Sequence, residues 1–411
     1  PSSLMLLNRI WIGMFLIAAI VAGSKLVFWQ DTYIFKELVD ALFSATKTGF
    51  EISLYLTGVL CFWLGIMKIG ENGGAVRYLT RAVSPLFSKL LPEVPKNHPA
   101  IGAMMMNFSA NMLGLDNSAT PLGLKAMKEL QTLNPEKEVA SNAQIMFLVL
   151  NTSGLTIIPV SIFALRAESS SPTNVFLPIL ITTFISSLFG LIIVSIKQKI
   201  NLLNRTVILY IGSLIVLIGS LLAYIVYHPE QSELISNIAG NGLIFLIIIT
   251  FIVLGAFKRI NVYDSFIDGA KEGFNVAISI IPYLVGILVA ISVFRASGSL
   301  EALLDGIRVT AVYFGVTAME WIDALPVAFM KPLSGGGARA AFVDVMNEFK
   351  VDSLQEKIAA TMQGSTETTF YVLAVYFGSV NIKNTRYAAG AGLLCDFVGI
   401  ISAIIISYLF Y

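Results

Sequence analysis

Charged residues are scarce in this sequence. Of its 411 residues, 13% are charged and 56% are hydrophobic, whereas soluble domains contain about 25% charged residues. The mean hydropathy is +0.79. This composition predicts an integral membrane protein rather than a soluble one. The formal net charge of +1 gives no electrostatic basis for binding nucleic acid, so we expect no nucleic-acid partner.

Cysteine and histidine are rarer still. Cys61 and Cys395 lie in apolar runs far apart in the sequence, so we expect two buried free thiols. His98 and His228 are isolated, and no metal-ligand spacing occurs. The sequence also lacks H-E-x-x-H, G-x-S-x-G and a paired Cys and His, which argues against an enzyme and leaves only Ser/Lys or Asp/Asp chemistry open. We expect no resident metal or cofactor.

Long apolar runs dominate the rest of the chain. A transmembrane helix needs about 20 apolar residues. The sequence predicts clean spans at Ile10–Trp29, Ile52–Met67, Asn174–Ile196, Thr206–Tyr227, Asn241–Phe257, Asn275–Phe294 and Tyr387–Tyr411. The first of these contains Lys25 and shows no clear cleavage pattern, so we interpret it as a span and not as a signal peptide.

Other segments are apolar but interrupted. Polar groups break the runs at Gln144–Leu165, Val309–Phe329 and Ile358–Phe377. Three stretches mix apolar and charged residues and predict amphipathic helices at the membrane interface: Tyr33–Lys47, Gly74–Lys89 and Asn261–Lys271. Together these segments predict an all-α integral membrane protein with about nine to ten membrane segments.

The sequence contains an internal repeat. KTGFEISLYLTGVL at Lys47 resembles KEGFNVAISIIPYL at Lys271, and a polar segment, a broken span and a long apolar span follow each copy. We predict repeats at residues 1–197 and 238–411, joined by a transmembrane helix in residues 198–237. One extra span between copies with an even number of crossings inverts the second copy. Lys and Arg are concentrated in segments that are inside if the N-terminus is cytoplasmic, which supports an inverted-topology repeat.

Each copy carries a polar segment at a position where the pattern predicts membrane depth. NFSANMLGLDNSATP predicts a re-entrant helix–turn–helix, because irregular backbone in a membrane must be buried in protein or line a cavity. Asn117 or Ser118 can cap the second helix, with Pro121 in its first turn. In the second copy, the glycines of PLSGGGARAAF predict an anion-friendly nest of backbone amides beside Arg339.

The broken spans supply the other half of the predicted site. LNTSGL and QGSTETT interrupt apolar runs with amides and hydroxyls, and opened helix turns offer carbonyls to a cation and amides to a polar solute. The spacing pairs Thr152 with Ser365 and Ser153 with Thr366. The residues predicted to bind solute are Asn107, Asn111, Asp116, Asn117, Ser118, Thr120, Asn151, Thr152, Ser153, Ser334, Gly335, Gly336, Gly337, Arg339, Gln363, Ser365, Thr366, Glu367 and Thr368.

Five acidic residues are candidates for binding a coupling ion. They are Asp116, Glu320, Asp323, Glu367 and Asp396. A charge near the bilayer centre costs at least about 2.5–3.5 kcal/mol, so such residues usually serve a function. Glu320 and Asp323 lie three apart and could share a proton or hold Na⁺. The alternatives are exposure at the interface for that pair, and an ion pair with Lys or Arg for Glu367 and Asp396.

The quoted motifs resemble those of a known family. NFSANMLGLDNSATPLGLKAM with NTSGLTIIP is similar to spore maturation protein A, and PLSGGGARAAFVDVM with GSTETTFYVLAVYFG is similar to spore maturation protein B. The resemblance covers nearly the whole chain and implies a nucleoside-recognition, or gate, domain in a bacterial cytoplasmic membrane. It also implies that Ser365–Glu367 lie in an unwound span, with Asn151–Ser153 in its symmetry mate, and a role in spore maturation.

These features favour a secondary carrier. We expect alternating access to move a small polar or anionic solute, such as a nucleoside-like compound, coupled to Na⁺ or H⁺. A lipid or lipid-linked precursor flippase and a non-transporting membrane scaffold are the alternatives. A flippase needs a lateral opening, and a scaffold has no need of polar re-entrant segments. The expected partners are the lipid bilayer and a small solute, and the sequence leaves room for a homo-oligomer.

Overall fold

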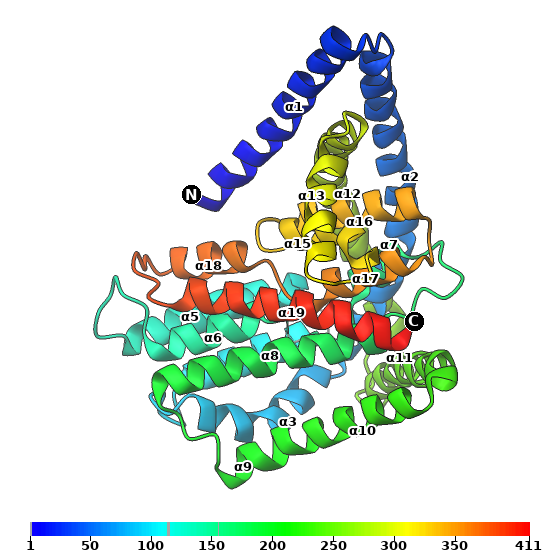
Figure 1. The fold of residues 1–411 in the computed structure, drawn as a ribbon. Helices are drawn as coiled ribbons and strands as arrows, with labels where there is room; N and C mark the ends of the chain where they lie inside the picture. The colour runs from blue at the N-terminus through cyan, green and yellow to red at the C-terminus, as the bar shows by residue number, and fades with distance from the viewer. Residues whose placement is uncertain (1, 113–115, 155) are drawn as a thin grey trace.

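The computed structural model describes residues 2–112, 116–154 and 156–411, and these are almost entirely helical (Figure 1). The first part of the chain forms α1 (Ser2–Trp29), α2 (Ile34–Asn72), α3 (Ala75–Leu90), α4 (Pro99–Met112), α5 (Asp116–Leu133), α6 (Asn142–Thr152), α7 (Val160–Leu165) and α8 (Phe176–Gln198). The connecting part forms α9 (Arg205–Val207), the π-helical turn η1 (Ile208–Gly212), α10 (Ser213–Tyr227) and the 3₁₀ turn η2 (Pro229–Gln231).

The last part of the chain forms a second series of helices in a similar order. They are α11 (Ser232–Phe257), α12 (Val262–Ala296), α13 (Ser299–Tyr313), α14 (Glu320–Asp323), α15 (Leu325–Met330), α16 (Gly335–Phe349), α17 (Leu354–Ser365), α18 (Thr369–Gly378) and α19 (Ala388–Phe410). A very long helix is the second element of each series, and a long apolar helix closes each. The domain boundaries at residues 197 and 237 remain a prediction.

In the described part of the chain, seven helices are long and apolar enough to cross a membrane. They are Asn8–Trp29, Ile34–Asn72, Phe176–Gln198, Arg205–Tyr227, Gly240–Phe257, Val262–Ala296 and Ala388–Phe410. Each contains nearly all of one of the seven clean spans expected from the sequence. The prediction of an all-α membrane protein is therefore confirmed.

The expected boundaries of two of these helices are wrong. Tyr33–Lys47 and Asn261–Lys271 do not form separate interfacial helices, because α2 and α12 run through them without a break. Only the stretch at Gly74–Lys89 forms a helix of its own, α3. Glycines within these helices, such as Gly49 and Gly273, lie where the two long helices touch.

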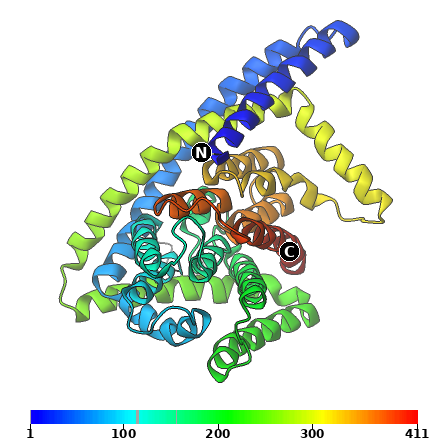
Figure 2. The same cartoon turned by 90° about the vertical axis from the view of Figure 1, so that its left-hand side faces the viewer.

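Helices α2 and α12 run side by side in opposite directions (Figure 2). A Cβ added at Gly49 would lie 2.8 Å from Val285 Cγ2, and one added at Gly273 would lie 2.8 Å from Cys61 Cα. The two glycines have the same separation along the chain as Cys61 and Val285. Each helix therefore presents the same position to its partner, which is the contact that a pseudo-two-fold axis creates.

The two closing helices repeat this arrangement. Ser186 Oγ on α8 donates to the carbonyl of Cys395 on α19 at 3.0 Å. A Cβ at Gly190 would meet Cys395 Sγ at 2.8 Å, and one at Gly399 would lie 3.6 Å from Ser186 Oγ. The pairs show that α8 and α19 are antiparallel, and Figure 1 shows them side by side. Small residues allow the close approach that helix packing in membranes requires.

The glycine contact between α2 and α12 can be tested by adding one methyl group. In Gly273→Ala the new Cβ would lie 2.5 Å from the Leu60 carbonyl oxygen, so we expect overpacking that costs about 1–3 kcal/mol. Gly286→Ala is the matched control on the same helix, because nothing lies within 4 Å of its Cβ position. Thermal unfolding in detergent should show a lower melting temperature for the first variant only. Equal melting temperatures would contradict the close contact.

Candidate functional site

The two broken helices meet at their breaks. Helix α6 ends at Thr152 and α17 ends at Ser365. The backbone N–H of Glu367 donates to the Thr152 carbonyl at 2.9 Å. Gly154 has φ +76°, and a Cβ there would lie 2.8 Å from Thr366 Cα. Only glycine combines this backbone conformation with so close an approach. The position of Gly154 therefore fixes where the two segments of the chain cross.

The helices that lead to the crossing begin with the same cap. The Ser141 hydroxyl accepts from the backbone N–H of Gln144 at the start of α6, and Ser353 does the same for Glu356 at the start of α17. At the other end, Ser153 Oγ donates to the carbonyl three residues earlier at 3.0 Å. Ser365 Oγ makes the matching bond at 2.7 Å.

These matching bonds correct the pairing expected from the sequence. The separation between the two caps aligns Ser153 with Ser365 and Gly154 with Thr366. The predicted pairing of Thr152 with Ser365 and of Ser153 with Thr366 is therefore wrong by one residue. That pairing was based on the spacing to the closing spans, and this spacing does not show where α6 and α17 begin. In the corrected alignment, the touching residues Gly154 and Thr366 are equivalent positions, so the crossing lies on the pseudo-two-fold axis.

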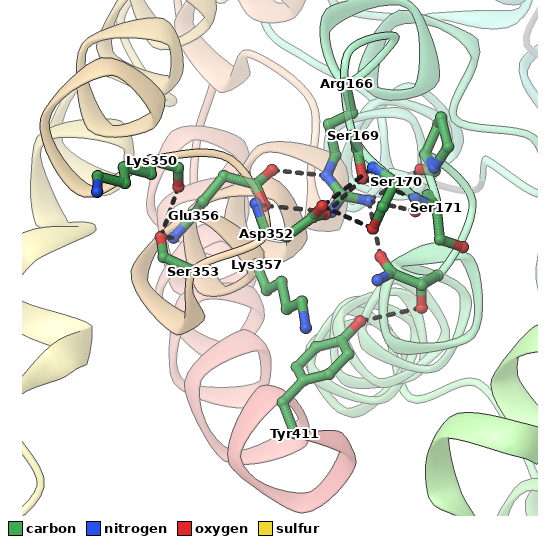
Figure 3. Close-up of polar contacts among 12 residues, drawn as sticks. Arg166, Ser169, Ser170, Ser171, Lys350, Asp352, Ser353, Glu356, Lys357 and Tyr411 are labelled. Carbon is green, nitrogen blue, oxygen red and sulfur yellow. Dashed lines mark hydrogen bonds and ion pairs between the residues drawn. The ribbon is translucent and has the colours of Figure 1, made fainter.

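Arg166 closes one end of the crossing segments (Figure 3). It follows α7, is fully buried, and donates from Nε to Glu356 Oε1 at 2.6 Å and from Nη2 to Glu356 Oε2 at 3.1 Å. Nη2 also lies 3.1 Å from Asp352 Oδ1. Nη1 donates to the Asn174 side chain at 2.7 Å and the Pro172 carbonyl at 2.9 Å. Each guanidinium nitrogen thus has an acceptor, so we interpret the cluster as a clasp between the two halves.

The pKa values of the two carboxyls of this clasp are shifted in opposite directions. Burial raises the pKa of Glu356 above its ordinary value, although the Arg166 charge opposes that shift. Burial also acts to raise the pKa of Asp352, but hydrogen bonds from Ser169 and Ser170 and the charge of Arg166 hold that pKa below its ordinary value. Sequence reasoning missed the clasp, because a single Arg after an apolar segment does not reveal its partners.

A second clasp closes the other end of the crossing segments. Lys383 Nζ, after α18, lies 2.6 Å from Glu138 Oε1, before α6. Arg386 Nη1 donates to the Asn142 side chain at 2.9 Å and the Ala140 carbonyl at 3.1 Å. The end of each broken segment thus binds the start of the other. The lysine pair is exposed to 73% and 65%, unlike the buried Arg166.

The crossing lies midway between the clasps. Helix α6 has 11 residues and α17 has 12, so each covers about 17 Å at the rise of an α-helix. Laid end to end, the two helices therefore have a length close to the thickness of a bilayer core, about 30 Å. We infer from this length that the crossing lies near the membrane midplane.

Three amides from the first half line the crossing. Asn111 Nδ2 donates to Asn151 Oδ1 at 2.7 Å, and Asn107 Nδ2 donates to the Ala119 carbonyl at 2.8 Å and to Tyr376 OH at 3.3 Å. Asn151 donates in turn to a carbonyl of its own helix. The structure thus brings together three predicted residues, and it adds a tyrosine from the second half that sequence reasoning missed.

A lysine occupies the equivalent place in the second half. The Met112 carbonyl accepts from a backbone N–H after the first break, and the Pro332 carbonyl accepts from one after the second break, at 2.8 and 3.1 Å. Asn111 and Lys331 directly precede these two residues. Lys331 Nζ is buried and donates to the Gln363 carbonyl at 2.6 Å. Sequence reasoning predicted no role for Lys331.

The second half also contains buried polar atoms without hydrogen bonds. Asp396 is 2% exposed, and it shares a face of α19 with Gly392 and Gly399, whose Cβ positions meet the methyl groups of Thr369 and Thr366. Both threonine hydroxyls lie close enough to influence the carboxyl. Among the described residues, no hydrogen bond reaches either Asp396 oxygen, these two hydroxyls or Gln363 Oε1. Such atoms are rare in proteins and call for an explanation.

The glycine segment has a different form from the one predicted. Gly335–Gly337 form the first turn of α16 rather than a loop before it, and the Ser334 hydroxyl accepts from the Gly337 N–H at 3.0 Å. A Cβ at Gly335 would lie 3.1 Å from Thr368 Oγ1, so the positive end of α16 lies beside the second break. Arg339 follows one turn later, is half-buried, and its Nε has no partner among the described residues.

Other predicted residues lie elsewhere or have their own partners. Helix α5 begins at Asp116, so Asn117 and Ser118 lie within the helix and not at its cap. The side chains of these three residues lie outside the described part of the structure. Thr120 is half-buried and has a partner. Glu367 is half-buried at the crossing, while Thr152 and Ser153 are buried there and bond mainly to their own helix.

Glu320 and Asp323 do not act as a carboxylate pair. Glu320 accepts from Tyr408 OH at 2.7 Å, and this hydrogen bond holds the pKa of Glu320 below its ordinary value. Asp323 forms an ion pair with Arg308 instead. The expectation of a shared proton or Na⁺ between them is therefore wrong in this structure, because each carboxylate is already stabilised by a separate group.

The fold and the site define a class of helical membrane protein in which two broken helices, related by a pseudo-two-fold axis, meet at their breaks. The gate family model described as "Nucleoside recognition" matches residues 53–168. Spore maturation protein B of Bacillus subtilis (strain 168) is 41% identical over 177 residues, which are 43% of this chain and 97% of that protein. Spore maturation protein A of the same organism is 39% identical over 190 residues, 46% of this chain and 93% of that protein. The chain belongs to the family of spore maturation proteins A and B.

The clasp at Arg166 can be tested by a double-mutant comparison. Arg166→Met leaves Glu356 buried without its cation, so we expect the folded state to lose about 3–5 kcal/mol. Arg166→Met/Glu356→Met replaces both charges with apolar groups and should recover much of this loss. Thermal unfolding in detergent measures both variants. Glu356→Met is measured as the second single variant. If the loss of stability in the double variant equalled the sum of the losses in the two single variants, the two side chains would not be energetically coupled.

Proposed function

We propose that this protein is a secondary carrier that moves a small polar or anionic solute by alternating access, coupled to Na⁺ or H⁺. The observation that supports this most strongly is the buried carboxyl of Asp396, which lies beside the hydroxyls of Thr366 and Thr369 at the crossing of the broken helices and has no ion pair among the described residues. Burying an ionisable group without a partner is costly, and proteins retain such a group when a bound species completes its environment. A scaffold has no need of such a group.

Asp396 is the proposed coupling group. Its carboxyl, with the hydroxyls of Thr366 and Thr369, supplies oxygen ligands for a small monovalent cation, or a proton can neutralise it. Lys331 and Glu367 both lie within electrostatic range of Asp396. The positive charge of Lys331 disfavours a divalent cation there. We therefore assign coupling to Asp396 first, with Glu367 nearer the solute.

The polar groups around the crossing suit a hydrogen-bonding solute. The amides of Asn107, Asn111 and Asn151 offer donors and acceptors, and the start of α16 with Arg339 favours a negatively charged group. The description of the gate family, "Nucleoside recognition", makes nucleosides and nucleotides the first solutes to test. We propose no resident cofactor.

The two clasps provide the gates. Opening the Arg166 clasp would expose the crossing to one side of the membrane, and opening the Lys383–Glu138 clasp would expose it to the other. Because each clasp joins one half of the chain to the other, a rocking motion of the halves separates one clasp while it preserves the other. We further propose a bacterial cytoplasmic membrane location, with the N-terminus and the Lys383–Glu138 clasp on the cytoplasmic side.

The coupling role is tested by Asp396→Asn, with exposed Asp268→Asn as the matched control. Asn has nearly the same shape as Asp but cannot ionise, so we expect Asp396→Asn to fold with an unchanged or higher melting temperature. Thermal shifts are measured with nucleosides, nucleotides and small carboxylates, each with and without Na⁺ and at two pH values. A ligand of the folded state raises its melting temperature by mass action.

For the wild-type protein and Asp268→Asn, we expect one solute class to shift the melting temperature in a manner that depends on Na⁺ or pH. In Asp396→Asn the ion dependence should disappear, and gradient-driven uptake into proteoliposomes should fall to background. Wild-type uptake by this variant would remove Asp396 from the coupling site. A lack of ion-dependent shift and of uptake for every solute would contradict the carrier itself.

A further inference from the structure

A basic cavity lies away from the crossing, where the end of α2, the start of α3 and the end of α11 come together. Its volume is about 190 Å³, and it is lined by Asn72, Gly74, Arg77, Tyr78, Arg81 and Lys258. Three of the six lining residues carry a positive charge, and none is acidic. A concave surface of this composition favours an anion.

The nearby carboxylates do not neutralise these cations. At this end of α2 and α12, Glu71 and Glu272 both pair with Lys68, at 3.1 and 3.4 Å. Asp268 lies 3.9 Å from Lys271, and the Asp264 carboxylate accepts from the Asn261 side chain. Within the part of the chain that the structure describes, no ion pair is formed by Arg77, Arg81 or Lys258. Their charges are therefore available to a ligand.

The equivalent place in the other half of the chain has the opposite character. Gly74 and Gly298 both have positive φ, +89° and +86°, and each precedes an amphipathic helix after one of the two long helices. The separation that relates these glycines places Glu301 at the position of Arg77, and Asp305 at that of Arg81.

The acids at these equivalent positions neutralise the cations around them. Arg295 binds Glu301 at 2.5 Å, and Arg308 binds Asp305 at 2.6 Å. One end of the pseudo-symmetric molecule thus carries unpaired positive charge, and the other end carries balanced charge. The positive-inside rule favours cations at one end of an inverted repeat, but it does not require them to line one cavity, and Arg77, Arg81 and Lys258 do. Their shared cavity therefore points to a ligand.

We infer that the cavity at Arg77, Arg81 and Lys258 binds the phosphate-bearing headgroup of an anionic phospholipid. The cavity lies at the end of a helix long enough to cross a membrane, beside the amphipathic helix α3, which is the depth of lipid headgroups. Arginine forks match phosphate oxygens, and the exposed ring of Tyr78 suits the interface. This site is separate from the proposed carrier site and does not depend on it.

The test uses the detergent-purified full chain titrated with dioctanoyl phosphatidylglycerol, dioctanoyl phosphatidylcholine or inorganic phosphate. We expect only phosphatidylglycerol to raise the melting temperature strongly, because it supplies both the anion and the acyl chains. Arg77→Gln/Arg81→Gln should weaken this effect about fivefold for each charge removed, without changing the melting temperature in the absence of lipid. Lys258→Gln, on a different helix, gives an independent variant should the double variant fold poorly.

The matched control is Lys125→Gln/Lys128→Gln, which removes two exposed charges outside the cavity. It should retain the full response to phosphatidylglycerol. An equal loss in this control would show general electrostatic attraction and overturn a specific site. An equal response to phosphatidylcholine would assign the effect to acyl chains, and an equal response to inorganic phosphate would replace the lipid with a free anion. Either result would overturn the inference.

Discussion

The structure depends on the contact between Gly154 and Thr366. Two helices that stop inside a membrane leave backbone donors and acceptors without partners, and hydrocarbon offers none. Here each break lies against the other, and the Glu367 N–H is bonded to the Thr152 carbonyl across the contact. Because Gly154 has a positive φ and no Cβ, the two segments come close enough to form that hydrogen bond. The clasps, the caps and the flanking re-entrant helices hold this crossing in place.

The two halves share a backbone arrangement but have different chemistry. Asn111 in the first half corresponds to Lys331 in the second, and the register set by the caps aligns Asn151 with Gln363. In the first half the amides bond to one another, whereas in the second half several buried atoms have no partner among the described residues. Amides that bond to one another are held in position for a solute, which would replace some of those bonds. Groups that remain unsatisfied can respond directly to a bound ion.

Much of this arrangement could be predicted from the sequence. Apolar runs located the seven long helices, and amides and hydroxyls around a glycine located both breaks. The sequence could not show that α2 and α12 continue through their charged beginnings, because a glycine such as Gly273 ends a helix in one setting and packs two helices in another. Nor could it show that Asp323 forms an ion pair with Arg308 instead of a carboxylate pair with Glu320, or that Arg166 binds Glu356. Such partners depend on contacts between residues far apart in the chain.

The difference between the two clasps has a kinetic consequence. Arg166 is completely buried in a network of hydrogen bonds, while the Lys383–Glu138 pair is largely exposed to solvent. Separating a buried ion pair requires several bonds to break before water can replace them, whereas an exposed pair exchanges readily. In an alternating cycle, the face with the exposed clasp would open more often and the other face would open rarely and briefly. Opening of the face with the buried clasp would then be the rate-limiting step of the cycle, while the gradients would still set the equilibrium.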